Sequence, residues 1–389
     1  MMTLKPVLRR LWRISVIALA VACAACSVGP DYVRPNVAVP AAYKEQPQQH
    51  AVDGLWQPAS PDPAGAIDSR WWTLFHDDTL SELCERALKA NQTIAQYEAA
   101  YRSARAQVAS SRASLFPTVS FAGSGTRSGS GSSSAYANWS SSYTTRSVSA
   151  ELEASWEPDL WGSVRRSVES SRAVAEASDA QLAGERLSIV ATLAVGYFTV
   201  RLADADLALL DEERKIDAEL LALTEAKYRQ GVSSYDDVRT AHITLQVIDE
   251  SIATAQLTRR QYDHAIAVLV GEAPAAFTLA PHSEYRFDTP ALPSAVPSQL
   301  SQRRPDIVQG ERTVAGYNAK IGVAKAGYFP SLTLSADGGF SGASLVHLVS
   351  LPTRFWSLGL DVAQTVFDAG ATSAAVDQAR ANYDQQVAA

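Results

Sequence analysis

The sequence predicts a mainly α fold with a small β part, in which long coiled-coil helices accompany four membrane β-strands that contribute to a shared oligomeric β-barrel. Three observations predict this fold. The stretch between Pro158 and Pro274 contains no proline, four short segments alternate apolar and polar residues, and these segments fall into two copies of an internal repeat. Four strands cannot close a membrane barrel, which needs about eight or more, so several chains must share one.

Long helices are expected where proline is absent. The stretch from Pro158 to Pro274 is rich in Ala, Leu, Glu, Arg and Gln, which are good helix formers. Two helices are predicted, over about 163–230 and 235–270. The first would be roughly 100 Å long at 1.5 Å per residue, far longer than a typical globular helix.

The two helices are separated by one break, Gln-Gly-Val-Ser-Ser. Gly231 suits the position after a helix C-cap, and Ser233 or Ser234 suits an N-cap. Beyond the break, apolar residues recur in heptads that only Arg259 interrupts, which predicts coiled-coil packing. The seam consists of Val238, Ala241, Leu245, Ile248, Ile252, Ala255, Arg259, Tyr262, Ile266 and Leu269.

The clearest strand prediction is a strict alternation over residues 148–157. One face is apolar and the other is polar and acidic, with Glu151 and Glu153 as candidate residues facing the interior of a channel. Paired carboxylates also occur in catalytic sites, but carboxylates that line one face of an alternating strand favour a polar channel wall. The apolar set is Val148, Ala150, Leu152, Ala154 and Trp156, and the polar set is Ser149, Glu151, Glu153, Ser155 and Glu157.

Weaker alternation occurs at 118–121, 331–334 and 356–367. Strand pairs are therefore expected over about 118–157 and 331–367. The segments between the paired strands, 123–142 and 338–354, are expected to be exposed loops, the first because it is rich in Gly and Ser.

An internal repeat divides the chain. Residues 115–121 align without a gap with residues 328–334, and Gly162 aligns with Gly370. The expected organisation is a signal peptide at 1–25, an N-terminal lipoprotein segment at 26–78, a first repeat at 79–275, and a linker with an incomplete second repeat at 276–389.

The second repeat is shorter than the first, which continues for 109 residues after Gly162 to Gly271. We expect that roughly 90 residues equivalent to the end of the first repeat are absent after Ala389. Seam residues Leu245, Ile248 and Ile252 would then lack a neighbour, and the 389-residue chain alone would form no stable oligomer.

The N-terminus is typical of an export signal. Basic residues precede a short apolar run at 14–22, which ends in small residues, as in a signal peptide. The run is too short to span a bilayer, and no uninterrupted 18-residue apolar run exists elsewhere. The Ala-Ala-Cys ending resembles a bacterial lipobox, which makes Cys26 the expected acylated residue; Cys23 is the alternative.

Charge and motifs exclude several function classes. The chain carries a net charge of −7, and four basic residues but no acid precede Cys26, so the remainder carries −11 and nucleic acid is not an expected partner. The six histidines show no metal-ligand spacing, and neither a nucleophile elbow nor a phosphate loop occurs. No enzymatic activity, cofactor or metal is predicted. Cys84 lies in a helical context and is expected to be packed and inert.

Five motifs carry a family resemblance. They are Cys-Ser-Val-Gly-Pro-Asp-Tyr-Val-Arg-Pro at 26–35, Trp-Trp-Thr-Leu-Phe at 71–75, Trp-Glu-Pro-Asp-Leu-Trp-Gly at 156–162, Tyr-Arg-Gln-Gly at 228–231 and Arg-Arg-Pro-Asp-Ile at 303–307. Together they resemble the TolC-like outer membrane efflux proteins, specifically the NodT-like lipoprotein branch.

The resemblance implies a homotrimer with a 12-stranded barrel and a helical tunnel in the periplasm. Its members are exit ducts that work with an inner-membrane pump and a periplasmic adaptor in Gram-negative bacteria. It implies a lipid-anchored, passive conduit for drugs or other small molecules, in contact with outer membrane lipid. Ser27, after the cysteine, fits sorting to the outer membrane.

The resemblance also places the turn between the long helices at the periplasmic tip. Gly231, Tyr235, Asp236 and Asp237 become candidate tip or pore residues. The two aspartates suit the N-terminus of a helix equally well, because its dipole favours acids there. The alternative functions are a periplasmic coiled-coil structural lipoprotein, a glycan hydrolase, or a non-functional truncated efflux protein.

Overall fold

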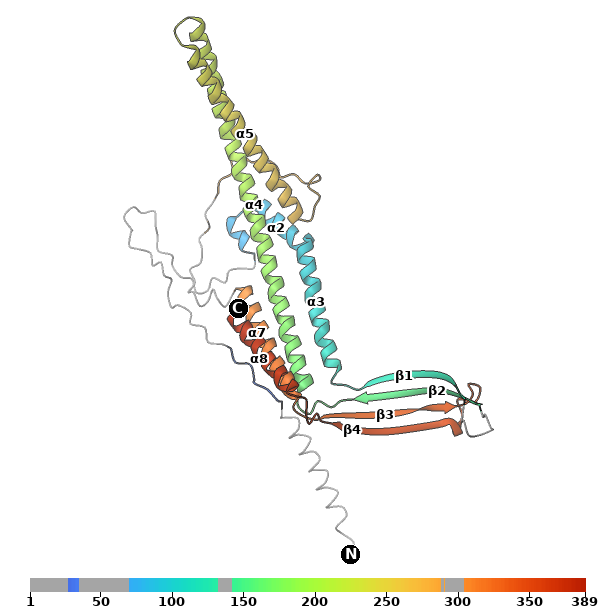
Figure 1. Cartoon of the computed structure of the whole chain (residues 1–389). Helices are drawn as coiled ribbons and strands as arrows, with labels where there is room; N and C mark the ends of the chain where they lie inside the picture. The colour runs from blue at the N-terminus through green and yellow to red at the C-terminus, as the bar shows by residue number, and fades with distance from the viewer. Residues whose placement is uncertain (1–26, 35–69, 132–141, 288–289, 291–303) are drawn as a thin grey trace. The chain divides into compact units, whose positions relative to one another are not determined.

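A computed structural model describes residues 27–34, 70–131, 142–287, 290 and 304–389 (Figure 1). The expected signal peptide and Cys26 lie outside these residues. The elements in chain order are η1 (Trp71–Phe75), α2 (Asp78–Ala90), α3 (Gln92–Ala113), β1 (Thr118–Gly131), β2 (Ser142–Trp156), α4 (Ser163–Arg229), α5 (Tyr235–Leu269), α7 (Pro305–Ala326), β3 (Ser331–Gly342), η2 (Leu351–Thr353), β4 (Arg354–Ala363) and α8 (Ala371–Ala388). The predicted mainly α fold with a small β part is confirmed.

One compact unit contains the sheet, and its parts are residues 1–36, 102–177 and 309–389. The sheet is antiparallel in the order β1-β2-β3-β4. A helix precedes and follows each strand pair, so the pattern helix–hairpin–helix occurs twice, first with α3 and α4 and then with α7 and α8.

Both loop predictions were too long. Strand β1 continues through the Gly/Ser-rich segment to Gly131, and β3 continues to Gly342, because each backbone pairs with its neighbour along the whole length. Glycine is required at one such place: a Cβ on Gly339 would overlap the carbonyl oxygen of Ala150 on β2. Side chains with low strand propensity are tolerated where the backbone pairs with a neighbouring strand.

The last strand is shorter than predicted. Strand β4 ends at Ala363 rather than Phe367. Beyond it, the Gln364 amide donates to the carbonyl of Tyr328, and the Asp368 carboxylate accepts from the backbone N–H groups of Gly370 and Thr372. These hydrogen bonds commit residues 364–370 to the turn that begins α8.

The second compact unit, residues 37–101 and 178–308, is helical. Helix α5 lies antiparallel to the C-terminal part of α4 (Figure 1). Gly196 on α4 leaves room for the approach of Ile266 and Tyr262. The core packs α2, α4, α5 and the segment after α5 around Trp72, Tyr197, Leu193 and Ile266.

The predicted heptad seam faces α4 within the same chain. Ile248 is buried, and Leu245 and Ile252 are half-buried, so the expectation that these residues lack a neighbour was wrong. A different stripe is exposed. Five apolar residues of α4, spaced seven apart, are each 53–65% exposed: Val195, Leu202, Leu209, Ile216 and Leu223.

Helix α4 contains an 18-residue window that is apolar enough to cross a bilayer, although charged residues interrupt its apolar run. More than half of that window is buried inside the protein. We therefore interpret it as the core of the helical unit rather than as a membrane span.

Candidate functional site: strand faces, helical turn and anchor segment

The sheet separates its side chains by chemistry. The register places Glu153 opposite Asp337 and places Asp361 opposite Thr333, and Glu151 lies on the same face two residues before Glu153. All four acids of the strands therefore share one face. Ser357 donates to the Asp337 carboxylate at 2.8 Å on this face. A polar face of this kind suits the wall of a water-filled pore.

The opposite face is apolar and exposed. Phe121 lies opposite Leu152, and the register continues through Gly338 to Trp356. The exposed fractions are 72% for Phe121, 57% for Leu152 and 72% for Trp356. Strands β1 and β4 form the two edges of the sheet. An exposed apolar face with open edges is stable in lipid only after the edges pair with other strands.

The turn between α4 and α5 has the local structure that its sequence predicts. Gly231 adopts φ +72°, its N–H bonds the carbonyl of Tyr228, and the N–H of Val232 bonds that of Lys227. This pair of hydrogen bonds is a Schellman C-cap, which favours glycine because a Cβ is strained at positive φ. Ser234 is the N-cap of α5.

The two candidate tip aspartates have different environments. The Asp237 carboxylate accepts hydrogen bonds from the hydroxyls of Ser233 and Ser234, both at 2.8 Å, and from the N–H of Ser234 at 2.9 Å. These donors hold the pKa of Asp237 below its usual range. Asp237 therefore closes a capping box in which Asp236 and Tyr235 take no part, and all three residues are exposed.

The segment after the expected acylation site is held by the sheet-containing unit. The N–H of Val28 donates to the carbonyl of Trp161 at 3.0 Å, and the Asn318 amide donates to that of Pro30 at 3.0 Å. The buried Arg166 guanidinium pairs with Asp31 at 2.7 Å and with Glu169 at 2.8 Å. The sequence motif that ends at Cys26 does not predict this docking, because the contacting residues lie more than a hundred positions apart in the chain.

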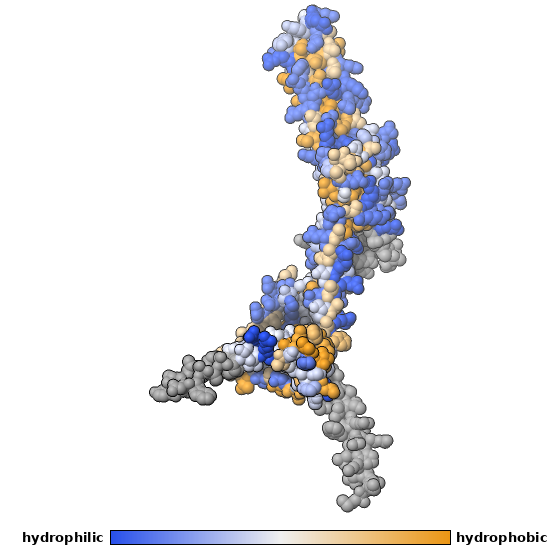
Figure 2. Space-filling view, turned by 90° about the vertical axis from the view of Figure 1, so that its right-hand side faces the viewer, coloured by the Kyte–Doolittle hydropathy of each residue, from blue (hydrophilic) through white to orange (hydrophobic). Residues whose placement is uncertain are grey.

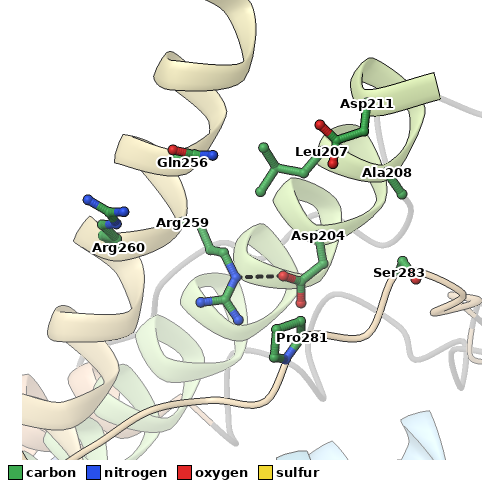
Figure 3. Close-up of a pocket in the computed structure, with 9 residues that line it drawn as sticks. All are labelled: Asp204, Leu207, Ala208, Asp211, Gln256, Arg259, Arg260, Pro281 and Ser283. Carbon is green, nitrogen blue, oxygen red and sulfur yellow. Dashed lines mark hydrogen bonds and ion pairs between the residues drawn. The ribbon is translucent and has the colours of Figure 1, made fainter. Parts of the chain in front are cut away.

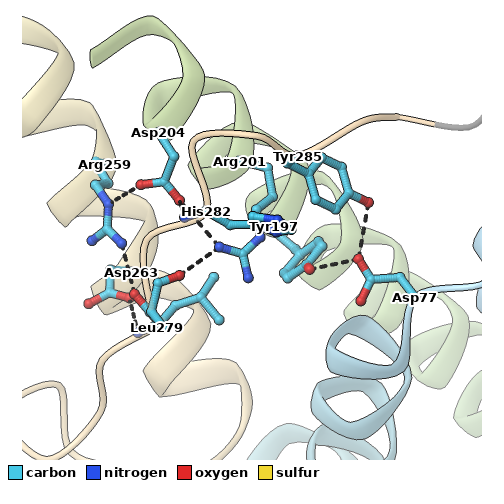
Figure 4. Close-up of polar contacts among 10 residues, drawn as sticks. Asp77, Tyr197, Arg201, Asp204, Arg259, Asp263, Leu279, His282 and Tyr285 are labelled. Atoms are coloured by element: carbon cyan, nitrogen blue, oxygen red, sulfur yellow. Dashed lines mark hydrogen bonds and ion pairs between the residues drawn. The ribbon is translucent and has the colours of Figure 1, made fainter. Parts of the chain in front are cut away.

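A buried polar network fixes the base of the helical hairpin (Figure 4). The Asp204 carboxylate accepts from Arg259 at 2.6 Å, from Arg201 at 3.2 Å and from the N–H of His282 at 3.1 Å. Arg201 and Arg259 also donate to the backbone carbonyls of Ala280 and Leu279, both at 2.7 Å. The network explains Arg259, the one charged residue in the predicted seam.

A second carboxylate joins the same region. Asp77, the N-cap of α2, accepts from the hydroxyls of Tyr197 at 2.7 Å and Tyr285 at 3.0 Å (Figure 4). Burial and the hydrogen bond to Asp77 raise the pKa of Tyr197 to about 12. Both tyrosines therefore stay protonated at physiological pH and act as structural donors.

A groove of about 530 Å³ lies beside this network (Figure 3). It runs between α4 and α5, and the Arg259–Asp204 pair forms part of its lining. The Asp204 and Arg259 side chains in its lining are engaged in structural hydrogen bonds, so we assign no catalytic role to them. The lining residues are Asp204, Leu207, Ala208, Asp211, Gln256, Arg259, Arg260, Pro281 and Ser283.

Neither metal binding nor thiol chemistry has support in the described part of the chain. Among those residues, no group of three or more His, Cys, Asp or Glu side chains lies close enough to hold a metal ion. Cys84 is fully buried, and burial raises the pKa of its thiol to about 12. The thiol is therefore protonated and shielded from reagents.

These features define a class of protein. A two-faced sheet with open edges and a long antiparallel helical hairpin, repeated in part within one chain, suit a subunit of an oligomeric membrane channel.

Comparison with known proteins identifies the family. The profile of the outer membrane efflux protein family matches residues 83–272 and 296–389. The chain is 30% identical over 381 residues to the probable efflux pump outer membrane protein TtgC of Pseudomonas putida, covering 96% of this chain and 76% of that protein. It is 27% identical over 381 residues to the cation efflux system protein CusC of Escherichia coli, covering 95% and 79%.

Solved channels share the fold. The outer-membrane channel OprN superposes with a TM-score of 0.79 at 30% identity, over 93% of this chain and 78% of that one. A crystal structure of CusC gives 0.76 at 26% identity, over 93% and 78%. This chain belongs to the outer membrane efflux protein family, and it is an outer membrane efflux channel of the kind that serves tripartite systems. Members of the family are channels rather than enzymes, and they are trimers that work with adaptors and inner-membrane pumps.

Proposed function

We propose that three copies of this chain close one β-barrel in the outer membrane of a Gram-negative bacterium and extend their helices into the periplasm. The assembly is a passive exit duct for small molecules that an inner-membrane pump and a periplasmic adaptor deliver. The observation that supports this most directly is the division of one sheet into an exposed apolar face and a face that carries all four strand acids. The edge strands β1 and β4 would pair with the neighbouring copies.

The transported molecules are selected before they reach this channel. Relatives of 27–30% identity are named for the efflux of toluene, of antibiotics and of cations. A wall with spaced acids and hydroxyls, without a built pocket, suits passage of diverse solutes. We therefore place selectivity in the pump.

The four acids predict a cation-preferring pore. We expect the full-length protein in planar lipid bilayers to conduct cations better than anions. Replacing Glu151 and Glu153 by Gln should reduce that preference, since the counter-charge near the pore axis falls. The control is Glu219→Gln with Glu250→Gln, which removes two exposed acids from the helices. Absence of conductance, or equal selectivity in both double variants, would contradict the proposed duct.

Anchoring by lipid is part of the proposal. Cys26 directly precedes Ser27, and the residues from Val28 to Asp31 are hydrogen-bonded to the unit that contains the sheet. Several acyl chains on one cysteine would hold that segment stably at the membrane, at about 0.8 kcal/mol per buried CH₂.

Cys26→Ala is expected to abolish incorporation of labelled palmitate and to delay removal of the signal peptide. The matched control is Cys23→Ala, which should still incorporate palmitate and should lose its signal peptide at the normal rate. Metabolic labelling followed by gel mobility measures each outcome. Loss of labelling in Cys23→Ala and its retention in Cys26→Ala would show that the acylated residue is Cys23.

A further inference from the structure

The positive charges of the described strand residues all lie on one face of the sheet. Arg127 on β1 and Arg146 on β2 lie directly opposite each other in the register. Arg146 belongs to the alternating series that continues with Val148, Ala150 and Leu152, so Arg146 and its partner Arg127 lie on the apolar face. Arg354 begins β4 and lies opposite Phe340 on the same face. All three side chains are exposed.

Within the residues that the structure describes, no acid pairs with these arginines. Residues 118–150 and 338–360 contain no Asp or Glu in a chain that has 41 of them. The four strand acids lie on the opposite face. Like charges directly opposite each other on antiparallel strands destabilise the pair. The sheet therefore carries an uncompensated positive cluster that an external anion would stabilise.

The position of the cluster matches a membrane interface. Arg146 lies ten positions before Trp156 on β2, and a strand needs about 9–11 residues to cross the hydrocarbon core. Trp156 lies at the helical end, where its indole donates to the carbonyl of Leu115 at 3.1 Å. Arg127 and Arg146 then fall at the loop end, where an interfacial Arg costs little because its head reaches the headgroups, whereas the register places Arg354 level with Ala150, four residues nearer Trp156.

Apolar groups surround this end as well. Figure 2 looks onto the loop ends of the strands, where hydrophobic residues gather. The loop after β3 exposes Leu345 by 73% and Val346 by 85%, and Trp356 follows Arg354 on the apolar face of β4. A guanidinium beside exposed apolar side chains suits a ligand with both a phosphate and hydrocarbon chains, rather than free phosphate in water.

We propose that Arg127 and Arg146 bind the phosphate groups of an anionic lipid in the outer leaflet of the outer membrane. The guanidinium groups donate to the phosphate oxygens, and the neighbouring apolar side chains contact the acyl chains. The proposal rests on the proposed function for one point, namely that the helices lie in the periplasm and the loop ends face outward.

The test uses full-length protein extracted from outer membranes in mild detergent. Native mass spectrometry would count bound lipid after addition of a bis-phosphorylated acyl-disaccharide lipid, its dephosphorylated analogue, or inorganic phosphate. We expect retention of the phosphorylated lipid only. Arg127→Gln with Arg146→Gln should weaken that binding by about 30-fold, since each arginine near an anionic lipid contributes about fivefold.

Two controls make the result specific. Arg127→Lys with Arg146→Lys keeps the charge and should retain most of the binding. It shows whether replacing these two residues in itself prevents insertion of the barrel. Arg229→Gln with Arg239→Gln removes the same charge from the helical hairpin and should leave binding unchanged. Equal retention of the phosphorylated lipid in the Arg127/Arg146 Gln variant, or equal binding of the dephosphorylated analogue to the unmodified protein, would overturn the proposal. Normal conductance in the same preparation would show that the proposed duct stands even if lipid binding fails.

Discussion

Asp204→Ala is expected to lower the free energy of unfolding of the helical unit by about 3–5 kcal/mol. The Asp204 side chain is 2% exposed and is shared by Arg201 and Arg259, whose side chains are 6% and 15% exposed. Removing the carboxylate leaves two largely buried guanidinium groups whose remaining partners are backbone carbonyls and, for Arg201, the rings of Tyr197 and Tyr285. Urea unfolding followed by far-UV circular dichroism measures the change.

The matched control is Asp249→Ala on the same helical hairpin. Asp249 pairs with Arg214 at 2.6 Å, but both side chains are about half exposed, so its loss should cost only about 0–1 kcal/mol. A triple replacement of Arg201, Asp204 and Arg259 by apolar residues should recover much of the stability lost in Asp204→Ala, because no buried charge is then left unpaired. Equal costs for Asp204→Ala and Asp249→Ala would show that the buried network does not hold the hairpin base.

Leu152→Lys is expected to disfavour insertion of the barrel by about 2–4 kcal/mol if the residue lies near the bilayer midplane. Leu152 is 57% exposed on the apolar face and lies between Phe121 and Gly338 in the register. No water is available there to solvate an ammonium group. Folding into lipid vesicles, followed by resistance of the barrel to protease and to heat in gels, measures the loss.

Ser149→Lys on the same strand provides the comparison. Ser149 is on the polar face, where its hydroxyl contacts that of Ser124 at 2.8 Å. Its replacement should therefore cost no more than the loss of that hydrogen bond, about 0.5–1.5 kcal/mol. If Lys were tolerated equally at 149 and 152, the apolar face would not be the lipid-facing one.

Helices α4 and α5 and strand β2 could be predicted from the sequence, because their formation depends on residues that are close together in the chain. The absence of proline and the Gly231–Ser234 break predicted α4 and α5, because caps and turn geometry depend on adjacent residues. The alternation over 148–157 predicted the two faces of β2, because the side-chain period of a strand is two. The heptad seam identified the face of α5 that packs on α4.

Long-range pairing determined the bounds of strands whose composition predicted otherwise. A Gly/Ser-rich segment became the end of β1 because β2 pairs with it along its whole length. Gln364 and Asp368 ended β4 early through contacts that the alternation does not encode. The part that Asp237 takes in the capping box is local, by contrast, because its three hydrogen bonds come from Ser233 and Ser234.

The sequence by itself determined the fold class, the long helical hairpin and the chemistry of the strand faces. Those features follow from residue periodicity and from local caps. Only the tertiary structure decided that Arg259 is buried with Asp204, that Val28–Asp31 dock beside Arg166, and that Arg127 lies opposite Arg146. Each of these depends on residues that are distant in the chain, and their proximity is set by strand register and helix packing rather than by local propensity.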